Sequence, residues 1–257
     1  EKSLSESIPY ADARRFFGII EQTATTAFLI GFILLGGLNW IEKHALSWNL
    51  NPITTGLAVF TLFSLITGLF SLPFELYRIF SIEERFGFNR QTWKGFFIDQ
   101  IKGICIGASL GLPLLAAILW IMQSLGNNWW LWAWAALSGF SLFTMWIYPT
   151  ILAPLFNKFK PLEDAKLLKS IHEISNKAGF KASGIFVMNA SIRSTHGNAY
   201  FTGLFSKKRI VLFDTLLDTL KSQEIVSVLA HELGHFKLNH VRWGLVRSII
   251  MTGITFY

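Results

Sequence analysis

Charged residues and cysteine are both scarce in this sequence of 257 residues. Only 15% of the residues are Asp, Glu, Lys or Arg, against about 25% in soluble domains. The single cysteine, Cys105, lies in an apolar stretch, so no disulfide can form within the chain. The sequence also lacks internal repeats, low-complexity linkers and basic runs longer than Lys207-Lys208-Arg209. These absences exclude a disordered chain, a coiled coil and a disulfide-stabilised scaffold.

Apolar residues are abundant instead. Hydrophobic residues make up 52% of the chain, and glycine raises the apolar share to about 60%, above the range of soluble domains. Five tryptophans gather near one turn, at positions 120 to 134, as is typical of a membrane interface. Four stretches approach the length of about 20 residues that crosses a bilayer as a helix. They are Thr23–Trp40, Leu57–Leu72, Gly103–Met122 and Leu131–Leu152. The sequence therefore predicts a polytopic α-helical membrane protein.

Basic residues alternate between the connections of these stretches. Residues 1–22 hold three Lys or Arg, 41–56 one, 73–102 five, 123–130 none and 153–240 twelve. By the positive-inside rule, the connections rich in Lys and Arg face the cytoplasm, including the loop 73–102. The net charge of +7 is thus better explained by membrane topology than by a nucleic-acid partner. We expect a multi-pass protein of a bacterial inner membrane or of the endoplasmic reticulum membrane, with the lipid bilayer as a partner and no nucleic acid.

The chain from Ala153 to His240 indicates an α+β domain. Leu162–Ala178 has apolar residues at helical spacing, and Gly179 is the expected stop of that helix. We expect a second helix from the N-cap Ser222 to about His240, with Glu224 in its first turn. Strands are expected at Gly184–Met188, Ala199–Leu204 and Arg209–Phe213, with Ser206-Lys207-Lys208 as the turn before the third. A further membrane helix, cut short or continuous with the one before, is expected from Val241 to Tyr257.

The string His231-Glu232-Leu233-Gly234-His235 is the motif that carries chemistry. Because positions four apart share a helix face, both imidazoles can reach one zinc ion, at about 2.0–2.1 Å from each nitrogen. Glu232 can reach a water at that ion, act as its general base and pass the proton to the leaving amine. The motif therefore predicts His231 and His235 as metal ligands, Glu232 as the catalytic base and zinc as the cofactor.

The third ligand of a catalytic zinc site is not evident in this sequence. His240 lies five residues after His235, and a continued helix would rotate it by about 140° from that residue, so we do not expect it to bind. His172 and His196 stay as candidates, and we expect His172 at the surface. No Asp or Glu follows Glu232, which excludes a downstream carboxylate within these residues.

The sequence resembles the integral-membrane type I CAAX prenyl endopeptidases, a zinc metalloprotease family related to the HtpX heat-shock proteases. The resemblance covers nearly the whole chain, and its loop and strand motifs favour the prenyl protease branch over the HtpX branch. Besides the zinc helix, it includes Ser71-Leu72-Pro73-Phe74, Glu83-Glu84-Arg85-Phe86-Gly87-Phe88-Asn89, Tyr148-Pro149-Thr150-Ile151, Ala153-Pro154-Leu155-Phe156-Asn157, Arg193-Ser194-Thr195-His196-Gly197-Asn198-Ala199-Tyr200-Phe201-Thr202-Gly203 and Arg209-Ile210-Val211-Leu212-Phe213-Asp214-Thr215-Leu216-Leu217.

The resemblance implies a zincin-like site and a substrate edge. His231 and His235 would bind zinc and Glu232 would be the base, while Asn198-Ala199-Tyr200 would lie on an edge strand that an extended substrate can pair with. The predicted substrate-binding residues are His196, Asn198, Ala199 and Tyr200. The family's third ligand is a Glu well beyond the zinc helix, and its members have another span before the region of residues 1–22. We therefore interpret the chain as truncated at both ends and expect this stretch by itself to be inactive.

These observations predict a zinc-dependent membrane endopeptidase. It would hydrolyse peptide bonds near the C-terminus of membrane-associated peptide or protein substrates, prenylated (CAAX-type) ones among them. Residues 1–152 would form a membrane region of about four helices, and 153–257 a metalloprotease domain on the cytoplasmic side. Two alternatives stay open: a quality-control protease of the HtpX kind, which would use the same catalytic residues, and a non-catalytic membrane scaffold if the natural chain ends at Tyr257.

Overall fold

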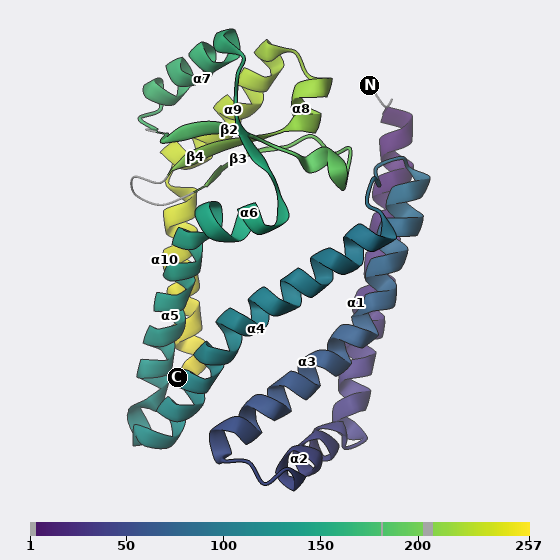
Figure 1. Ribbon diagram of the computed structural model, residues 1–257, viewed down its shortest axis with the longest axis vertical. Coiled ribbons are helices and arrows are strands. Elements are labelled where there is room, and N and C mark those ends of the chain that lie inside the picture. The colour runs from purple at the N-terminus through teal and green to yellow at the C-terminus, as the bar shows by residue number, and fades with distance from the viewer. Residues whose placement is uncertain (1–3, 181, 203–207) are drawn as a thin grey trace. The chain divides into compact units, whose positions relative to one another are not determined.

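The structure, a computed structural model, describes residues 4–180, 182–202 and 208–257 and divides into two compact units (Figure 1). One unit comprises residues 1–91 and 102–120, and the other comprises 92–101 and 121–257. Within these described residues, four helices are long and apolar enough to cross a membrane, namely Ile8–Leu34, Pro52–Glu83, Trp93–Ser124 and Gly126–Phe156. The predicted architecture, a polytopic helical protein with an α+β domain, is confirmed.

The first unit is built of helices. Its elements are α1 (Leu4–Leu34), α2 (Gly37–Ser47), α3 (Pro52–Tyr77), the π-helix η1 (Arg78–Glu83) and the middle of α4 (Trp93–Ser124). The predicted span Thr23–Trp40 is wrong in its bounds, because Gly36 takes a φ of 81° and separates α1 from α2. The helix α2 was not predicted from the sequence; it packs against α3 and α1 and buries Ile41 and Ala45.

Much of the predicted loop 73–102 is helical. The chain continues from α3 into η1 without a break, and a turn follows at Gly87, whose φ is 70°. Asn89 then stabilises the connection, since its Oδ1 accepts from the Gln91 N–H at 2.8 Å and its Nδ2 donates to Glu84 at 2.8 Å. The loop was predicted to begin and end where the apolar stretches do. Polar residues do not by themselves end a helix, so the helices extend beyond those stretches into the predicted loop.

The second unit combines two further apolar helices with a four-stranded sheet. Among the described strands the order is β1-β2-β4-β3, and of their pairs only β2–β4 is parallel. Besides the first and last turns of α4, the elements are η2 (Gly126–Asn128), α5 (Trp129–Ile147), the π-helix η3 (Tyr148–Leu152), α6 (Ala153–Phe156), β1 (Phe159–Pro161), α7 (Ala165–Lys177), β2 (Gly184–Met188), η4 (Ala190–Ile192), β3 (Ala199–Thr202), β4 (Arg209–Phe213), α8 (Asp214–Thr219), α9 (Ser222–Lys237) and α10 (His240–Phe256).

Most elements of the α+β domain were predicted, with shifts at their ends. The strands β2 and β4 have the predicted bounds, and Gly179, with a φ of 72°, ends α7 as expected. This helix begins at Ala165 rather than Leu162, because the Asp164 side chain accepts hydrogen bonds from the first N–H groups of the helix. Residues 203 and 204, which end the predicted strand Ala199–Leu204, and residues 206 and 207 of the predicted turn lie outside the described residues. The short elements β1 and α8 were missed.

The core of this unit lies between the sheet and the helices α7 and α9. Ile210 and Leu212 of β4, Ile171 of α7 and Leu229 of α9 are fully buried there. Fully burying one such side chain stabilises a fold by about 1.5–3 kcal/mol. On β3, Ala199 and Phe201 belong to this core, whereas Tyr200 packs with Met188 and Val211 in a second cluster. The alternation expected of a strand is therefore present.

The apolar helices α5 and α10 run side by side (Figure 1). The Trp134 indole donates a hydrogen bond to the Ile249 carbonyl at 2.8 Å, and Gly253 leaves room for its ring. Trp130 likewise makes an edge contact with Tyr257. Part of the tryptophan cluster predicted for the membrane interface thus packs against a helix.

Candidate metal centre

The helix α9 carries the zinc motif and is fixed by its buried stripe. Ile225, Leu229 and Leu233 are buried at intervals of four residues, so one face of the helix is held against the sheet. Residues two apart on a helix differ by about 200°, which turns His231 and His235 away from that face, and both side chains are exposed. The predicted cap at Ser222 is wrong: Lys221 is the N-cap, and its N–H donates to Glu224 Oε2 at 2.7 Å.

The two histidines of the motif face one another. Their Nε2 atoms lie 3.3 Å apart, and their ring planes cross at 81°. Two nitrogens bound to one tetrahedral ion at about 2.0–2.1 Å are about 3.3–3.4 Å apart. The separation in the structure therefore fits a single zinc-sized ion held by both Nε2 atoms. That these residues bind a metal stays a prediction.

Glu232 lies between the two histidines in sequence and is partly buried. Its carboxylate makes no hydrogen bond or ion pair with any described residue. Within the described part of the chain, no group of three or more His, Cys, Asp or Glu side chains is arranged to hold a metal. Among the described residues, the candidate metal site therefore consists of the histidine pair and the adjacent carboxylate.

His240 lies close to His235, contrary to the geometry assumed from the sequence. The helix α9 ends at Lys237, and Asn239 takes the left-handed conformation, with a φ of 56° and a ψ of 28°. A new helix, α10, then begins at His240. The prediction that α9 continues and turns His240 away from His235 is therefore wrong. The membrane helix expected from Val241 is a separate element, α10, and not a continuation of α9. The His240 Nδ1 lies 2.7 Å from His235 Nδ1.

The other two histidine candidates lie on separate elements. His172 is exposed on α7, as expected. His196 is exposed in the segment before β3, where its carbonyl accepts a hydrogen bond from Thr215 Oγ1 at 2.8 Å. Neither belongs to a three-ligand group among the described residues.

The predicted substrate segment is an edge strand, because β3 pairs with β4 alone among the described strands. Asn198 supports its start: its Oδ1 accepts from the Ala199 N–H at 2.8 Å, and its carbonyl accepts from the Phe213 N–H at 2.9 Å. Tyr200 points to the sheet face opposite α9, where its hydroxyl lies 3.9 Å from Met188 Sδ. Burial raises the pKa of Tyr200 to about 12, so this phenol stays protonated at neutral pH.

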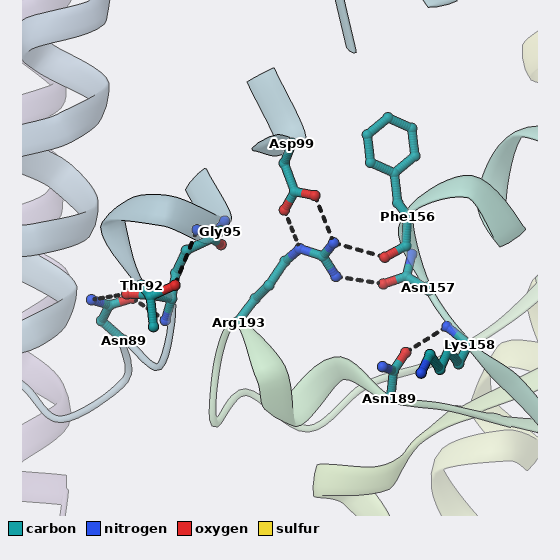
Figure 2. Close-up of polar contacts among 10 residues, drawn as sticks. Asn89, Thr92, Gly95, Asp99, Phe156, Asn157, Lys158, Asn189 and Arg193 are labelled. Atoms are coloured by element: carbon teal, nitrogen blue, oxygen red, sulfur yellow. Dashed lines mark hydrogen bonds and ion pairs between the residues drawn. The ribbon is translucent and has the colours of Figure 1, made fainter. Parts of the chain in front are cut away.

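Arg193 anchors the segment that leads to β3 (Figure 2). Its guanidinium donates to both carboxylate oxygens of Asp99 on α4, at 2.7 and 3.1 Å. It also donates to Asn157 Oδ1 at 2.8 Å and to the Phe156 carbonyl at 2.7 Å. Arg193 belongs to a motif that carries the family resemblance, but no role was predicted for it from the sequence. The signal that could have identified the pair is Asp99, the one acidic residue in the sequence of α4.

Two further contacts fix the same segment against α8. The Ser191 N–H donates to Asp214 Oδ1 at 2.9 Å, and the Ser191 hydroxyl donates to the other oxygen of that carboxylate. Gly197 lies so close to α8 that a Cβ there would be 3.2 Å from Leu216 Cδ1. The segment from 190 to 198 is thus held at both ends, which fixes the start of the edge strand.

The chain combines helices able to span a membrane with an α+β domain, in which one helix carries two histidines with facing Nε2 atoms. These features define a membrane protein of the zincin-like class. Comparison with known proteins gives the family. Residues 1–158 match the family described as CAAX prenyl protease N-terminal, five membrane helices, and residues 161–257 match peptidase family M48. The chain belongs to the CAAX prenyl protease branch of peptidase family M48. The family is one of metallopeptidases, which implies a metal cofactor.

Individual relatives agree with this membership. The chain is 37% identical to a CAAX prenyl protease 1 homolog of Arabidopsis thaliana, covering 100% of this chain and 62% of the relative. It is 38% identical to CAAX prenyl protease 1 of Saccharomyces cerevisiae, covering 87% of this chain and 49% of the relative. The crystal structure of S. mikatae Ste24p matches with a TM-score of 0.89 and 36% identity, covering 96% of this chain and 59% of that one. The chain thus spans about half to three fifths of these proteins.

Proposed function

We propose that the protein is a zinc-dependent membrane endopeptidase that cleaves near the C-terminus of prenylated, CAAX-type polypeptides. The observation that carries the proposal is the 3.3 Å separation of the His231 and His235 Nε2 atoms beside Glu232. The similarity to proteins named CAAX prenyl protease 1 in a plant and a yeast supports the prenylated substrate class. The same names support this reading over the alternative of an HtpX-like quality-control protease.

Zinc fits the donors that the chain presents. His231 and His235 would hold it through Nε2, with a third ligand supplied from outside the described residues. A zinc ion bound there would polarise the scissile carbonyl and acidify a water. Glu232 would take the proton of the attacking water on its carboxylate and return it to the leaving amine nitrogen. The absence of other contacts to the Glu232 carboxylate among the described residues suits this role.

The edge of β3 would hold the substrate in an extended conformation. The Phe213 N–H binds the Asn198 carbonyl, and Tyr200 is paired with Val211. Hydrogen-bonding direction alternates along an antiparallel strand, and the Ala199 N–H already donates to Asn198 Oδ1. The main-chain groups that point away from β4 are therefore the Ala199 carbonyl and the N–H and carbonyl of Phe201. A substrate strand could pair with these groups. Asn198 and Tyr200 would then support the edge, and the β3 strand would bring the scissile bond alongside α9, against which it packs.

We also propose that the α+β domain lies on the cytoplasmic side. Arg14 and Arg15 lie near the first end of α1, Arg78 near the last end of α3, and Lys94 at the first end of α4. In helices that cross a bilayer in alternating directions, these ends lie on the same side. The boundary between the membrane region 1–152 and the protease domain 153–257 would fall where η3 meets α6.

The decisive experiment compares variants of the full-length protein on a farnesylated C-terminal peptide and its unlipidated form, with and without a chelator. Glu232→Gln should lower turnover by about 10²–10⁴-fold while zinc stays bound, because the amide cannot accept the proton. His231→Ala should lose zinc together with activity.

Glu173→Gln is the matched control, since Glu173 is exposed on α7, and it should match the unaltered protein in both measurements. Zinc content is measured by elemental analysis beside the cleavage rate. A Glu232→Gln protein that cleaves at the unaltered rate would contradict the metalloprotease proposal. Equal cleavage of both peptides would instead remove the prenylated substrate class.

A further inference from the structure

His240 contacts the ring nitrogen of His235 that points away from His231. The two Nδ1 atoms are 2.7 Å apart, and the ring planes are inclined at 56°. On its other side, His235 faces His231 through Nε2. We propose that His240 is a positioning residue, which orients the zinc ligand His235 by accepting a hydrogen bond from its Nδ1. This inference rests on the function proposed above.

The chemistry of the two ring nitrogens supports this role. A histidine that binds a metal through Nε2 needs its lone pair there, so its proton is on Nδ1. Metal-binding histidines almost always donate this second N–H to an acceptor, which fixes the tautomer and the orientation of the ring. The acceptor nearest to the His235 Nδ1 in hydrogen-bonding range is His240 Nδ1. In this arrangement the His240 Nδ1 is the acceptor, and the ring proton of His240 is on Nε2, which does not contact His235.

The same geometry argues against His240 as the third ligand. A third ligand has to approach the point shared by the two Nε2 atoms. His240 contacts the opposite nitrogen of the His235 ring, so that ring lies between His240 and the ion position. His240 would thus act through His235 and not on the metal.

The junction between α9 and α10 places His240. The end of α9 is closed by hydrogen bonds from the Leu238 N–H to the Gly234 carbonyl, at 3.0 Å, and from the Asn239 N–H to the Phe236 carbonyl, at 2.9 Å. Asn239 then adopts the left-handed conformation, which asparagine tolerates better than most residues with a side chain. The chain can therefore start α10 with the His240 ring beside His235. A β-branched residue at 239 would strain this junction.

The test measures zinc affinity of the full-length protein in detergent, by competition with a chelator. His240→Phe keeps a ring of similar size but removes the acceptor, and it should weaken zinc binding by about 10–100-fold. His240→Asn keeps an acceptor at the position of Nδ1 and should restore most of that affinity. His172→Phe, at an exposed histidine on α7, is the control and should bind zinc like the unaltered protein.

A second pair of variants tests the junction without altering the histidine. Asn239→Gly permits the left-handed conformation and should keep the zinc affinity, whereas Asn239→Val should weaken it. The absorption bands of the cobalt-substituted protein report the ligand geometry and should shift in His240→Phe but not in His172→Phe. Thermal unfolding of the apo proteins identifies any variant that fails to fold.

Unchanged zinc affinity in His240→Phe would overturn the inference. So would equal weakening in His240→Asn and His240→Phe, because that result assigns the effect to ring packing and not to the hydrogen bond. If the unaltered protein binds no zinc, the proposed function fails and takes this inference with it. If it binds zinc and Glu232→Gln abolishes cleavage while His240→Phe changes nothing, the proposed function stands and only the role of His240 is refuted.

Discussion

Replacing Arg193 by lysine should destabilise the α+β domain, because a planar fork with several donors is replaced by a single ammonium. The guanidinium makes two hydrogen bonds to Asp99, one to Asn157 and one to the Phe156 carbonyl. These partners come from α4 and from the end of α6 (Figure 2). A lysine keeps the charge but cannot reproduce the bidentate contact and reach the other two partners at once.

The loss in the free energy of unfolding depends on how many hydrogen bonds Arg193→Lys removes and on how exposed they are to solvent. At least two of the four hydrogen bonds should be lost, and a hydrogen bond to a charged group contributes about 1.5–3 kcal/mol when buried. The Arg193 and Asp99 side chains are 26% and 23% exposed, so solvent reduces these contributions. We expect Arg193→Lys to lower the free energy of unfolding by about 2 kcal/mol. For a cooperative unit of about 150 residues, such as the second unit as a whole, that corresponds to a fall in Tm of about 4–8 °C.

Thermal unfolding in detergent, followed by tryptophan fluorescence at one scan rate, measures the effect. Arg90→Lys is the matched control, because Arg90 is exposed in the connection before α4, and its Tm should not change. Asp99→Asn and the double variant complete a cycle, in which the effects of the two single changes should not add. Additive shifts, or an unchanged Tm in Arg193→Lys, would refute the reasoning.

Three other predictions follow from single features of the chain. A Cβ at Gly234 would meet no atom within 4 Å, so Gly234→Ala should stabilise α9 by about 1 kcal/mol and raise the Tm without loss of zinc; a lower Tm would contradict this. The raised pKa of Tyr200, about 12, means that stability should fall as the pH rises from about 10 toward 12, because the unfolded chain releases its phenolic proton first. Tyr200→Phe should flatten that part of a profile of Tm against pH, and an unchanged profile would count against the shift. Cysteines introduced at Lys43 and Lys94, in a Cys105→Ser background, should react with an impermeant reagent from opposite sides of the membrane, and labelling from one side alone would reject the proposed topology.

The class of the fold was predicted well from the sequence, because the apolar composition of a chain indicates whether its helices lie in lipid or in water. Long apolar helices are required wherever the backbone meets lipid, and no other local feature is needed to recognise them. The predicted ends of the helices were less accurate, since a polar residue does not by itself end a helix. The true ends depend on caps such as Asn51, whose side chain accepts from the Thr54 N–H at 3.0 Å, and on turns such as that at Gly36. The short elements β1 and α8 have too few residues to show a period.

The candidate site was predictable where one helix determines it. The spacing of His231 and His235 on α9 places both rings on one face, and this follows from helix geometry alone. The proximity of His240 was not predictable by the same geometry, because one left-handed residue, Asn239, changes the direction of the chain. The contact between Arg193 and Asp99 joins residues 94 positions apart, and no periodicity in the sequence encodes such a pair.

The fold of the second unit explains how the proposed metal site can be held on an exposed helix face. Both histidines are exposed, so the direction in which α9 presents them depends on the packing of its opposite face. There Leu229 and Leu233 are buried against the sheet, and interior packing resists rotation of the helix because close-packed side chains leave few voids. The start of β3, which is proposed to hold the substrate, is fixed by charge and hydrogen bonding at Arg193, Ser191 and Asp214. A change in the core should therefore alter the alignment of both histidines together, whereas a change at Arg193 should alter the substrate edge and leave the metal ligands in place.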